Sequence, residues 1–138
     1  MLQDRKGNVM SDTDGMVCWT ELKTTDPKAA QEYCGSVCGW TFETIPAMEA
    51  ENPYVLCNRG DGKPIMAGIF DTTGIPMFDG LPPHWFTYFA VGDVDAAVKK
   101  AVAAGGTVQR EPFDIQGVGR IAIITDVVGA AKGLMTPA

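Results

Sequence analysis

Few side chains in this sequence could take part in catalysis or ligand binding. His84 is the single histidine among the 138 residues, and its imidazole could transfer a proton near neutral pH. Glu21 and Lys23 lie two positions apart in a predicted strand, so they could contact a ligand together or pair with each other on an exposed strand edge. Arg120 could meet a ligand anion or Glu21. No second histidine is available for a relay, and no Ser/His/Asp or Cys/His arrangement typical of nucleophilic catalysis stands out.

The four cysteines do not have the spacing of a metal site. Cys18, Cys34, Cys38 and Cys57 form no C-x-x-C motif, and His84 is far from all of them in sequence. We therefore expect free, buried thiols in a reducing compartment.

The charge balance restricts the possible partners. Seventeen acidic residues against eleven basic ones give a net charge of −6, which repels phosphate backbones and anionic membranes. Nucleic acid and membranes are therefore not expected partners, and neutral or cationic ones are favoured. The apolar runs are short, and the N-terminal residues lack the apolar core of a secretory signal, which predicts a cytoplasmic protein.

The elements that must position these side chains begin at Met16. Residues 16–24 alternate as a strand does, and Asp26-Pro27 is typical of a helix start. The strands WTFETI, PYVLCN and KPIMAGIF follow, with the last two joined as a hairpin. The helix is expected to end at Gly39 and to bury one face, formed by Ala30, Tyr33, Cys34, Val37 and Cys38.

The same order of elements returns in the second half of the chain. Asp93 lies 67 residues after Asp26 (93 − 26 = 67), and this offset also aligns Thr20 with Thr87 and Gly39 with Gly106. The chain is therefore predicted to contain two βαβββ modules, at about 16–71 and 84–137, within a single domain of residues 16–137. Residues 1–15 are expected to be a flexible extension, and the Gly/Pro-rich residues 72–83 a linker.

Three segments carry a resemblance to a known family. They are TELKTTDPKAAQEYCGSVCGW, the matching YFAVGDVDAAVKKAVAAGGTV, and Gly117-Val118-Gly119-Arg120 followed by Asp126-Val127-Val128-Gly129-Ala130. The sequence resembles the vicinal oxygen chelate superfamily, which includes glyoxalases, bleomycin resistance proteins and dioxygenases. The resemblance implies an α+β fold in which two tandem βαβββ modules form a curved mixed sheet around a cavity. It does not by itself imply one activity, since one fold can support many.

Enzymes of that superfamily bind a divalent metal through His, Gln or Glu on four strands. Carried over by register, the four ligand positions are Trp19, Met66, Phe86 and Gly133. None supplies the oxygen or imidazole ligand that such a metal needs, and shifting the register by one residue does not restore one. We therefore expect no metal and no other cofactor.

The resemblance further implies that the strand face carrying Trp19 and Phe86 lines the cavity, with Thr20, Leu22, Thr87 and Phe89 packing under the helices. Trp19 and Phe86 could instead simply fill the volume that a metal site would occupy. Catalytic residues remain unassigned. The expected ligand-binding residues are Trp19, Glu21, Lys23, Met66, His84, Phe86, Tyr88 and Arg120.

The favoured hypothesis is a binding protein similar to the bleomycin-resistance branch. It would hold a small aromatic or cationic organic molecule in a metal-free cavity, as in drug sequestration, and would form a homodimer. One alternative is a metal-dependent lyase, isomerase or dioxygenase with a non-standard site built from Glu21, His84 and a carboxylate of a second chain. A metal-free isomerase or lyase with His84 or Glu21 as base, and a module with a filled cavity and no ligand, also remain open.

Overall fold

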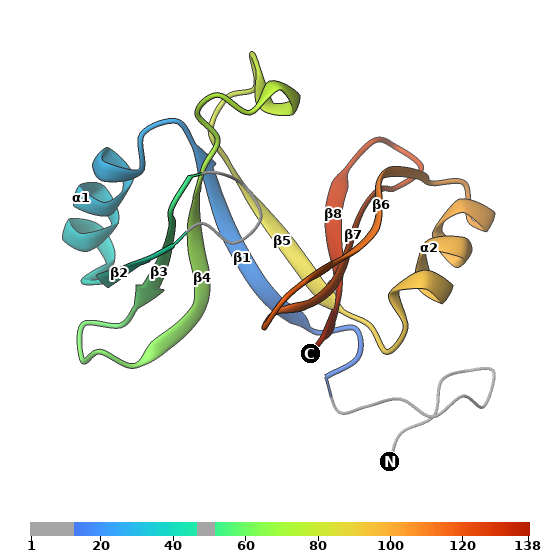
Figure 1. Ribbon diagram of the computed structural model, residues 1–138, viewed down its shortest axis with the longest axis horizontal. Coiled ribbons are helices and arrows are strands. Elements are labelled where there is room, and N and C mark those ends of the chain that lie inside the picture. The colour runs from blue at the N-terminus through green and yellow to red at the C-terminus, as the bar shows by residue number, and fades with distance from the viewer. Residues whose placement is uncertain (1–12, 47–51) are drawn as a thin grey trace. The chain divides into compact units, whose positions relative to one another are not determined.

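Residues 13–46 and 52–138 are described by the computed structural model, and they form two compact units (Figure 1). The first unit comprises Trp19–Phe86, and the second combines the described part of Met1–Cys18 with Thr87–Ala138. Each unit contains one α-helix that packs on parallel and antiparallel strands. The predicted α+β class and the repeated βαβββ order are therefore confirmed.

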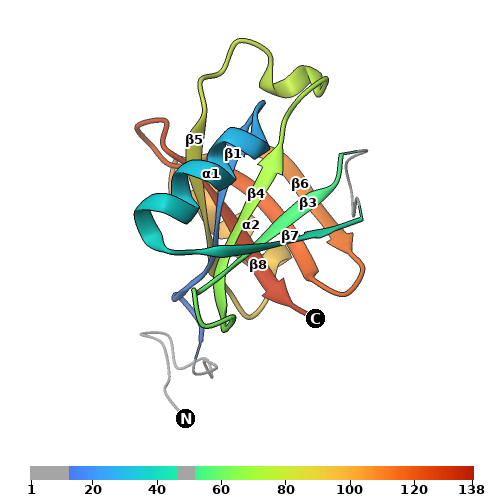
Figure 2. The same cartoon turned by 90° about the vertical axis from the view of Figure 1, so that its left-hand side faces the viewer.

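The first unit holds strands in the order β2-β3-β4-β1, with α1 across them (Figure 2). β1 and β4 are parallel, whereas β4 pairs with β3, and β3 with β2, antiparallel. Its core contains Val55, Cys57, Ala67 and Ile69, with Leu22 packed against them. The elements are β1 (Val17–Thr24), α1 (Pro27–Cys38), β2 (Thr41–Ile45), β3 (Tyr54–Asn58), β4 (Pro64–Asp71) and the 3-10 turn η1 (Pro76–Phe78).

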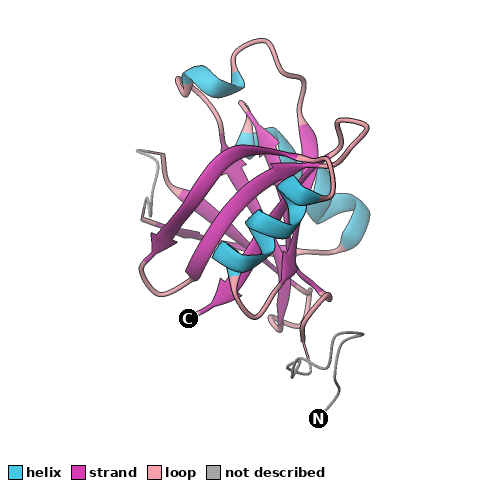
Figure 3. Ribbon diagram, turned by 90° about the vertical axis from the view of Figure 1, so that its right-hand side faces the viewer, coloured by secondary structure: helices cyan, strands magenta, loops and turns pink. Residues whose placement is uncertain are grey.

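The second unit repeats this arrangement with the strand order β5-β8-β7-β6 and α2 packed along the strands (Figure 3). β5 and β8 are parallel and the remaining pairs are antiparallel. Val94 and Val98 of α2 pack on Ala122, Ile124 and Leu134. The elements are β5 (His84–Ala90), α2 (Val94–Ala103), β6 (Thr107–Ile115), β7 (Gly119–Thr125) and β8 (Ala131–Pro137).

The helix boundaries follow the predicted capping residues. The Asp26 carboxylate accepts a hydrogen bond from Ala29 N, and Asp93 accepts the equivalent bond from Ala96 N. At the end of α1, Gly39 takes the left-handed conformation (φ 70°), which glycine adopts without steric cost.

The buried face predicted for α1 is only partly correct. Cys34 is its buried residue, whereas Tyr33 and Val37 are 69% and 63% exposed and Cys38 is also exposed. Periodicity gives the angular spacing of apolar residues but not the width of the contact, and in α1 Cys34 is buried while Ala30 packs against the core. The four cysteines are free, as expected, but only Cys34 and Cys57 are buried.

The structure describes part of the expected N-terminal extension and the whole of the expected linker. Most of the expected flexible extension, residues 1–12, lies outside the described residues. Within its described part, Gly15 N donates a hydrogen bond to Ala90 O. The expected linker 72–83 contains η1, whose Phe78 packs against Phe70 with ring centroids 5.8 Å apart. In the described part of the chain, no helix has the length and apolar character needed to span a membrane.

Candidate functional site

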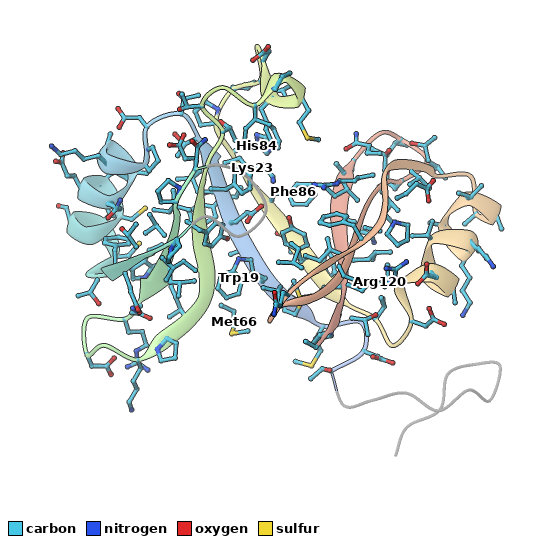
Figure 4. The ribbon with its side chains drawn as sticks, viewed as in Figure 1. Trp19, Lys23, Met66, His84, Phe86 and Arg120 are labelled. Atoms are coloured by element: carbon cyan, nitrogen blue, oxygen red, sulfur yellow. The ribbon has the colours of Figure 1, made fainter. Side chains whose placement is uncertain are left out.

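The first unit brings several predicted residues together along β1. Side chains alternate along a strand, so Trp19, Glu21 and Lys23 share one face while Leu22 enters the core on the other. Lys23 lies near His84 and Phe86 towards one end of β1, and Trp19 lies towards the other end (Figure 4).

Glu21 and Lys23 form a buried ion pair. Lys23 Nζ donates to Glu21 Oε2 at 2.8 Å, and each side chain is 6% exposed. The alternative in which Glu21 and Lys23 pair with each other is therefore confirmed. The expected exposure of the pair at a strand edge is wrong, because β4 covers one side of β1 and aromatic rings cover the side chains. Removing two charges from water is costly, so such a pair requires additional partners.

Tyr54 provides one of those partners. Its hydroxyl donates to Glu21 Oε1 at 2.7 Å and accepts from Trp19 Nε1 at 2.9 Å, which links the three side chains in a chain of hydrogen bonds. Tyr54 reaches β1 from β3 by crossing Gly68 on the intervening strand β4, where Gly68 pairs with Glu21. A Cβ atom at Gly68 would overlap the Tyr54 phenol, so glycine is required at this crossing.

Three phenylalanine rings surround the ammonium of Lys23. Its Nζ lies 4.9 Å from the ring centroids of Phe70 and Phe78 and 4.7 Å from that of Phe86. Ring faces attract cations, so these contacts offset part of the cost of burying Lys23. Of these three rings only Phe86 belongs to the predicted ligand-binding residues, and the cation that the rings surround is a side chain of this protein.

A small pocket opens at the Lys23 end of this network. Its volume is about 20 Å³, enough for a water molecule or one small polar group but not for a whole organic ligand. His84 Nδ1 lies 2.9 Å from Pro82 O; a carbonyl oxygen can only accept, so Nδ1 carries the hydrogen and Nε2 is the acceptor of the neutral ring. The lining residues are Lys23, Thr24, Thr25, Thr72, Phe78, Leu81, Pro82, Pro83 and His84.

Met66 and Tyr88, two other predicted ligand-binding residues, lie on β4 and β5. Met66, on β4, is 61% exposed. Tyr88 is buried in the second unit, where its ring covers Gly133 so closely that a Cβ there would overlap it. A binding role for these two residues stays a prediction.

Arg120, on β7 in the second unit, is engaged by the carboxylates of Asp95 and Asp114. Its guanidinium donates to both oxygens of Asp95, at 2.7 and 3.0 Å, and to Asp114 at 3.2 Å. These bonds raise the pKa of Arg120 and lower that of Asp95. A ligand anion would have to compete with both carboxylates.

The residues at the superfamily's metal positions do not fit a divalent ion. Trp19 Nε1 carries a hydrogen that it donates to Tyr54, and Phe86 offers only a ring face to Lys23. Met66 could offer a metal only a soft thioether sulfur, and Gly133 has no side chain that could ligate a metal. Among the described residues, no three His, Cys, Asp or Glu side chains lie close enough to hold a metal.

Sequence reasoning missed Tyr54, Phe70 and Phe78. Tyr54 and Phe70 lie opposite each other on β3 and β4, and their contact with the β1 face depends on strand register. Phe78 belongs to a segment without periodicity, where a single aromatic residue in a Gly/Pro-rich stretch was the only available signal.

The chain is similar to several known proteins. Residues 2–131 match the sequence model of the family described as the glyoxalase/bleomycin resistance protein/dioxygenase superfamily. A Mycobacterium bovis protein named as a glyoxylase, CFP32, is 40% identical over 116 residues, covering 84% of this chain and 43% of the relative. The anthracycline biosynthesis protein DnrV of Streptomyces peucetius is 31% identical over 135 residues, covering 88% and 48% respectively. The chain thus spans less than half the length of these relatives.

Solved structures with a similar fold include two methylmalonyl-CoA epimerases. The Streptomyces coelicolor enzyme has a TM-score of 0.66 and 18% identity, covering 92% of this chain and 99% of that one. The Mycobacterium tuberculosis enzyme has a TM-score of 0.59 and 17% identity, and the match covers 94% of this chain and 93% of that one. At this identity the likeness shows the fold alone.

Proposed function

This chain belongs to the glyoxalase/bleomycin resistance protein/dioxygenase superfamily, and we propose that it binds a small organic molecule at the Lys23 end of β1 without the help of a metal ion. Lys23, Phe78 and His84 contact the ligand in this proposal. Glu21, Tyr54 and Trp19 are positioning residues that hold the Lys23 ammonium in place.

The buried network around Lys23 carries the proposal. A fixed charge and a few polar groups in apolar walls are typical of small-molecule sites. Replacing a buried ion pair by apolar residues is often neutral or stabilising, so stability alone gives little reason for this pair. It does hold the ammonium at the edge of a pocket whose rim, Leu81–Pro82–Pro83, is exposed and apolar.

The size of the pocket indicates how a ligand would lie. A volume of about 20 Å³ admits one polar group, so the apolar body of the ligand would rest against the rim and Phe78. Two relatives are named as anthracycline biosynthesis proteins, which supports an aromatic ligand. Binding and sequestering the ligand without converting it is the simplest function for such a site. We propose that function for this chain and not for its relatives.

Metal-free proton transfer by His84 is a second candidate. Because Nδ1 donates to Pro82 O, the neutral ring presents Nε2 as a base, and His84 lines the pocket. An isomerase or lyase activity that survives EDTA and is lost in His84→Ala would support this candidate. Equal turnover by wild type and His84→Ala would contradict it.

Calorimetric titration with aromatic probes tests the binding function. The probes are an anthracycline, 2-naphthoate and 2-naphthylmethanol, added to chelator-treated protein. Phe78→Ala should weaken binding by about tenfold, because it removes a wall of the pocket. Met77→Ala is the matched control, since Met77 neighbours Phe78 in η1, is 53% exposed and does not line the pocket. Failure of all three probes, or equal affinity in wild type and Phe78→Ala, would contradict the proposal.

We also propose that the chain forms a homodimer. Tyr33 and Val37 on α1 are 69% and 63% exposed, and burial of such apolar side chains against a second copy supports this proposal. Sedimentation equilibrium should give twice the mass of one chain, and a monomer at micromolar concentration would contradict this.

A further inference from the structure

The pocket beside Lys23 is rich in hydrogen-bond donors. An ammonium has three N–H donors, and one of those of Lys23 goes to Glu21 Oε2. Thr24 Oγ1 accepts from Asp26 N, which leaves its own hydrogen available to donate. The Thr72 hydroxyl makes no hydrogen bond within the described residues, although its side chain is mostly buried.

The charges of the ion pair are also arranged unequally around the pocket. Lys23 lines it, whereas Glu21 does not, and none of the lining residues is acidic. A group entering the pocket therefore meets the positive member of the pair first. The rings of Phe70, Phe78 and Phe86 keep water from much of the ammonium, and electrostatic attraction is stronger where water is excluded.

A cationic ligand fits this arrangement poorly. The ring faces that would attract it already hold Lys23, and Glu21 is engaged by Lys23 and Tyr54. A cation in the pocket would be repelled by the fixed ammonium. The overall charge of −6 acts at longer range and is screened by salt, so the local field governs the bound group.

We propose that the ligand is an organic acid with an apolar body, and that its carboxylate enters the pocket to accept hydrogen bonds from Lys23, Thr24 and Thr72. The volume of about 20 Å³ suits a group of this size, and the apolar body lies over Leu81, Pro82 and Pro83. The inference rests on the proposed function, because it names the ligand class for the same site.

Three naphthalene probes that differ in one group test the charge preference. Calorimetry at low salt compares 2-naphthoate, 2-naphthylmethanol and 2-naphthylmethylammonium. The carboxylate should bind about tenfold more tightly than the alcohol, and the ammonium most weakly, because hydrogen bonds to a charged group are the stronger ones.

Variants assign the preference to Lys23. The double variant Glu21→Gln/Lys23→Met removes both charges, so no buried charge is left unpaired. It should bind the naphthoate about tenfold more weakly, whereas the alcohol, which offers the ammonium only a neutral hydroxyl, should lose about threefold or less. Thr72→Val is a smaller change that can be tested even if the double variant does not fold. It should weaken naphthoate binding about threefold. Lys132→Met is the matched control, since Lys132 also lies over a phenylalanine, at 5.1 Å from the Phe89 ring, but in the second unit. It should bind all three probes as wild type does.

The outcomes separate this inference from the proposed function. If neither the three naphthalene probes nor the anthracycline binds, both are overturned. If the alcohol or the ammonium binds as tightly as the naphthoate, or if the double variant and Thr72→Val keep the naphthoate preference, the organic-acid inference is overturned and the binding function stands.

Discussion

The Lys23 ammonium lies 2.8 Å from the Glu21 carboxylate, with both side chains on the same face of β1 and both buried. Residues two apart on a strand point to the same side, so this pair needs no turn or loop to form. Its burial depends on more distant residues, namely Tyr54 from β3 and the rings of Phe70 and Phe78. The ion pair at the centre of the site is therefore formed by residues close in sequence, whereas the surrounding side chains come from distant parts of the chain.

Breaking this pair from one side should destabilise the protein strongly. Glu21→Gln and Lys23→Met alone should each lower the free energy of unfolding by about 3–5 kcal/mol, because each leaves a buried charge without its partner. The double variant should lie within about 2 kcal/mol of wild type, since no buried charge then remains. Urea denaturation of the four proteins gives the coupling energy. Additive effects of the two single changes would contradict a coupled buried pair.

Gly68 should tolerate no side chain. Gly68→Ala places a Cβ against the Tyr54 phenol, and such overpacking should cost about 1–3 kcal/mol of unfolding free energy. Gly35→Ala is the control, because a Cβ at that position of α1 meets its nearest atoms at 3.5 Å, an ordinary contact, and alanine favours the helix by about 0.5–1 kcal/mol. Thermal denaturation would show the two variants shifting in opposite directions. A stable Gly68→Ala would mean that Tyr54 does not cross this glycine.

The cysteines should differ sharply in reactivity. Burial raises the pKa of the Cys57 thiol from 9.0 to about 12, whereas Cys38 is exposed at the end of α1. Brief iodoacetamide treatment of native protein followed by mass spectrometry should label Cys38 and leave Cys57 unmodified. Between pH 9 and 12 the unfolded state loses the Cys57 proton first, so stability should fall as pH rises. A Cys57→Ala variant should lose less stability over that interval, and an identical pH dependence would contradict the assignment.

Asp126 should contribute to stability only when it is ionised. Its carboxylate accepts hydrogen bonds from Val128 N and Ala130 N, which lower its pKa below the ordinary 3.8. The contribution is therefore present above pH 3.8 and is lost as pH falls through the lowered pKa. Acid titration followed by circular dichroism should show wild type losing stability more steeply than Asp126→Asn. Asp79→Asn, at an exposed aspartate, should behave as wild type, and equal slopes for all three proteins would contradict the prediction.

Local patterns predicted the helix starts at Asp26 and Asp93 because capping depends on residues close in sequence. Strand alternation likewise placed Trp19, Glu21 and Lys23 on one face. The contact of Tyr54 with Glu21 could not be predicted in this way, since it depends on the register of three strands and on the space left by Gly68.

The expected cation site illustrates a second limit. Strand alternation placed Glu21 and Lys23 on one face, but it could not show that the Lys23 ammonium would pair with Glu21 and lie against the rings of Phe70, Phe78 and Phe86. Phe78 was unpredictable for another reason, since a three-residue 3-10 turn that begins at a proline leaves no periodic pattern.

The imidazole signal of His84 offers the most direct measurement of ligand binding at the Lys23 end of β1. As the single histidine, it gives one ring Hε1–Cε1 resonance in a carbon-correlated NMR spectrum and needs no assignment by mutation. Titration with 2-naphthoate should shift this resonance along a saturating curve in wild type and much less in Phe78→Ala. Calorimetric binding of 2-naphthoate that leaves the His84 resonance unmoved would contradict a site at this end of β1.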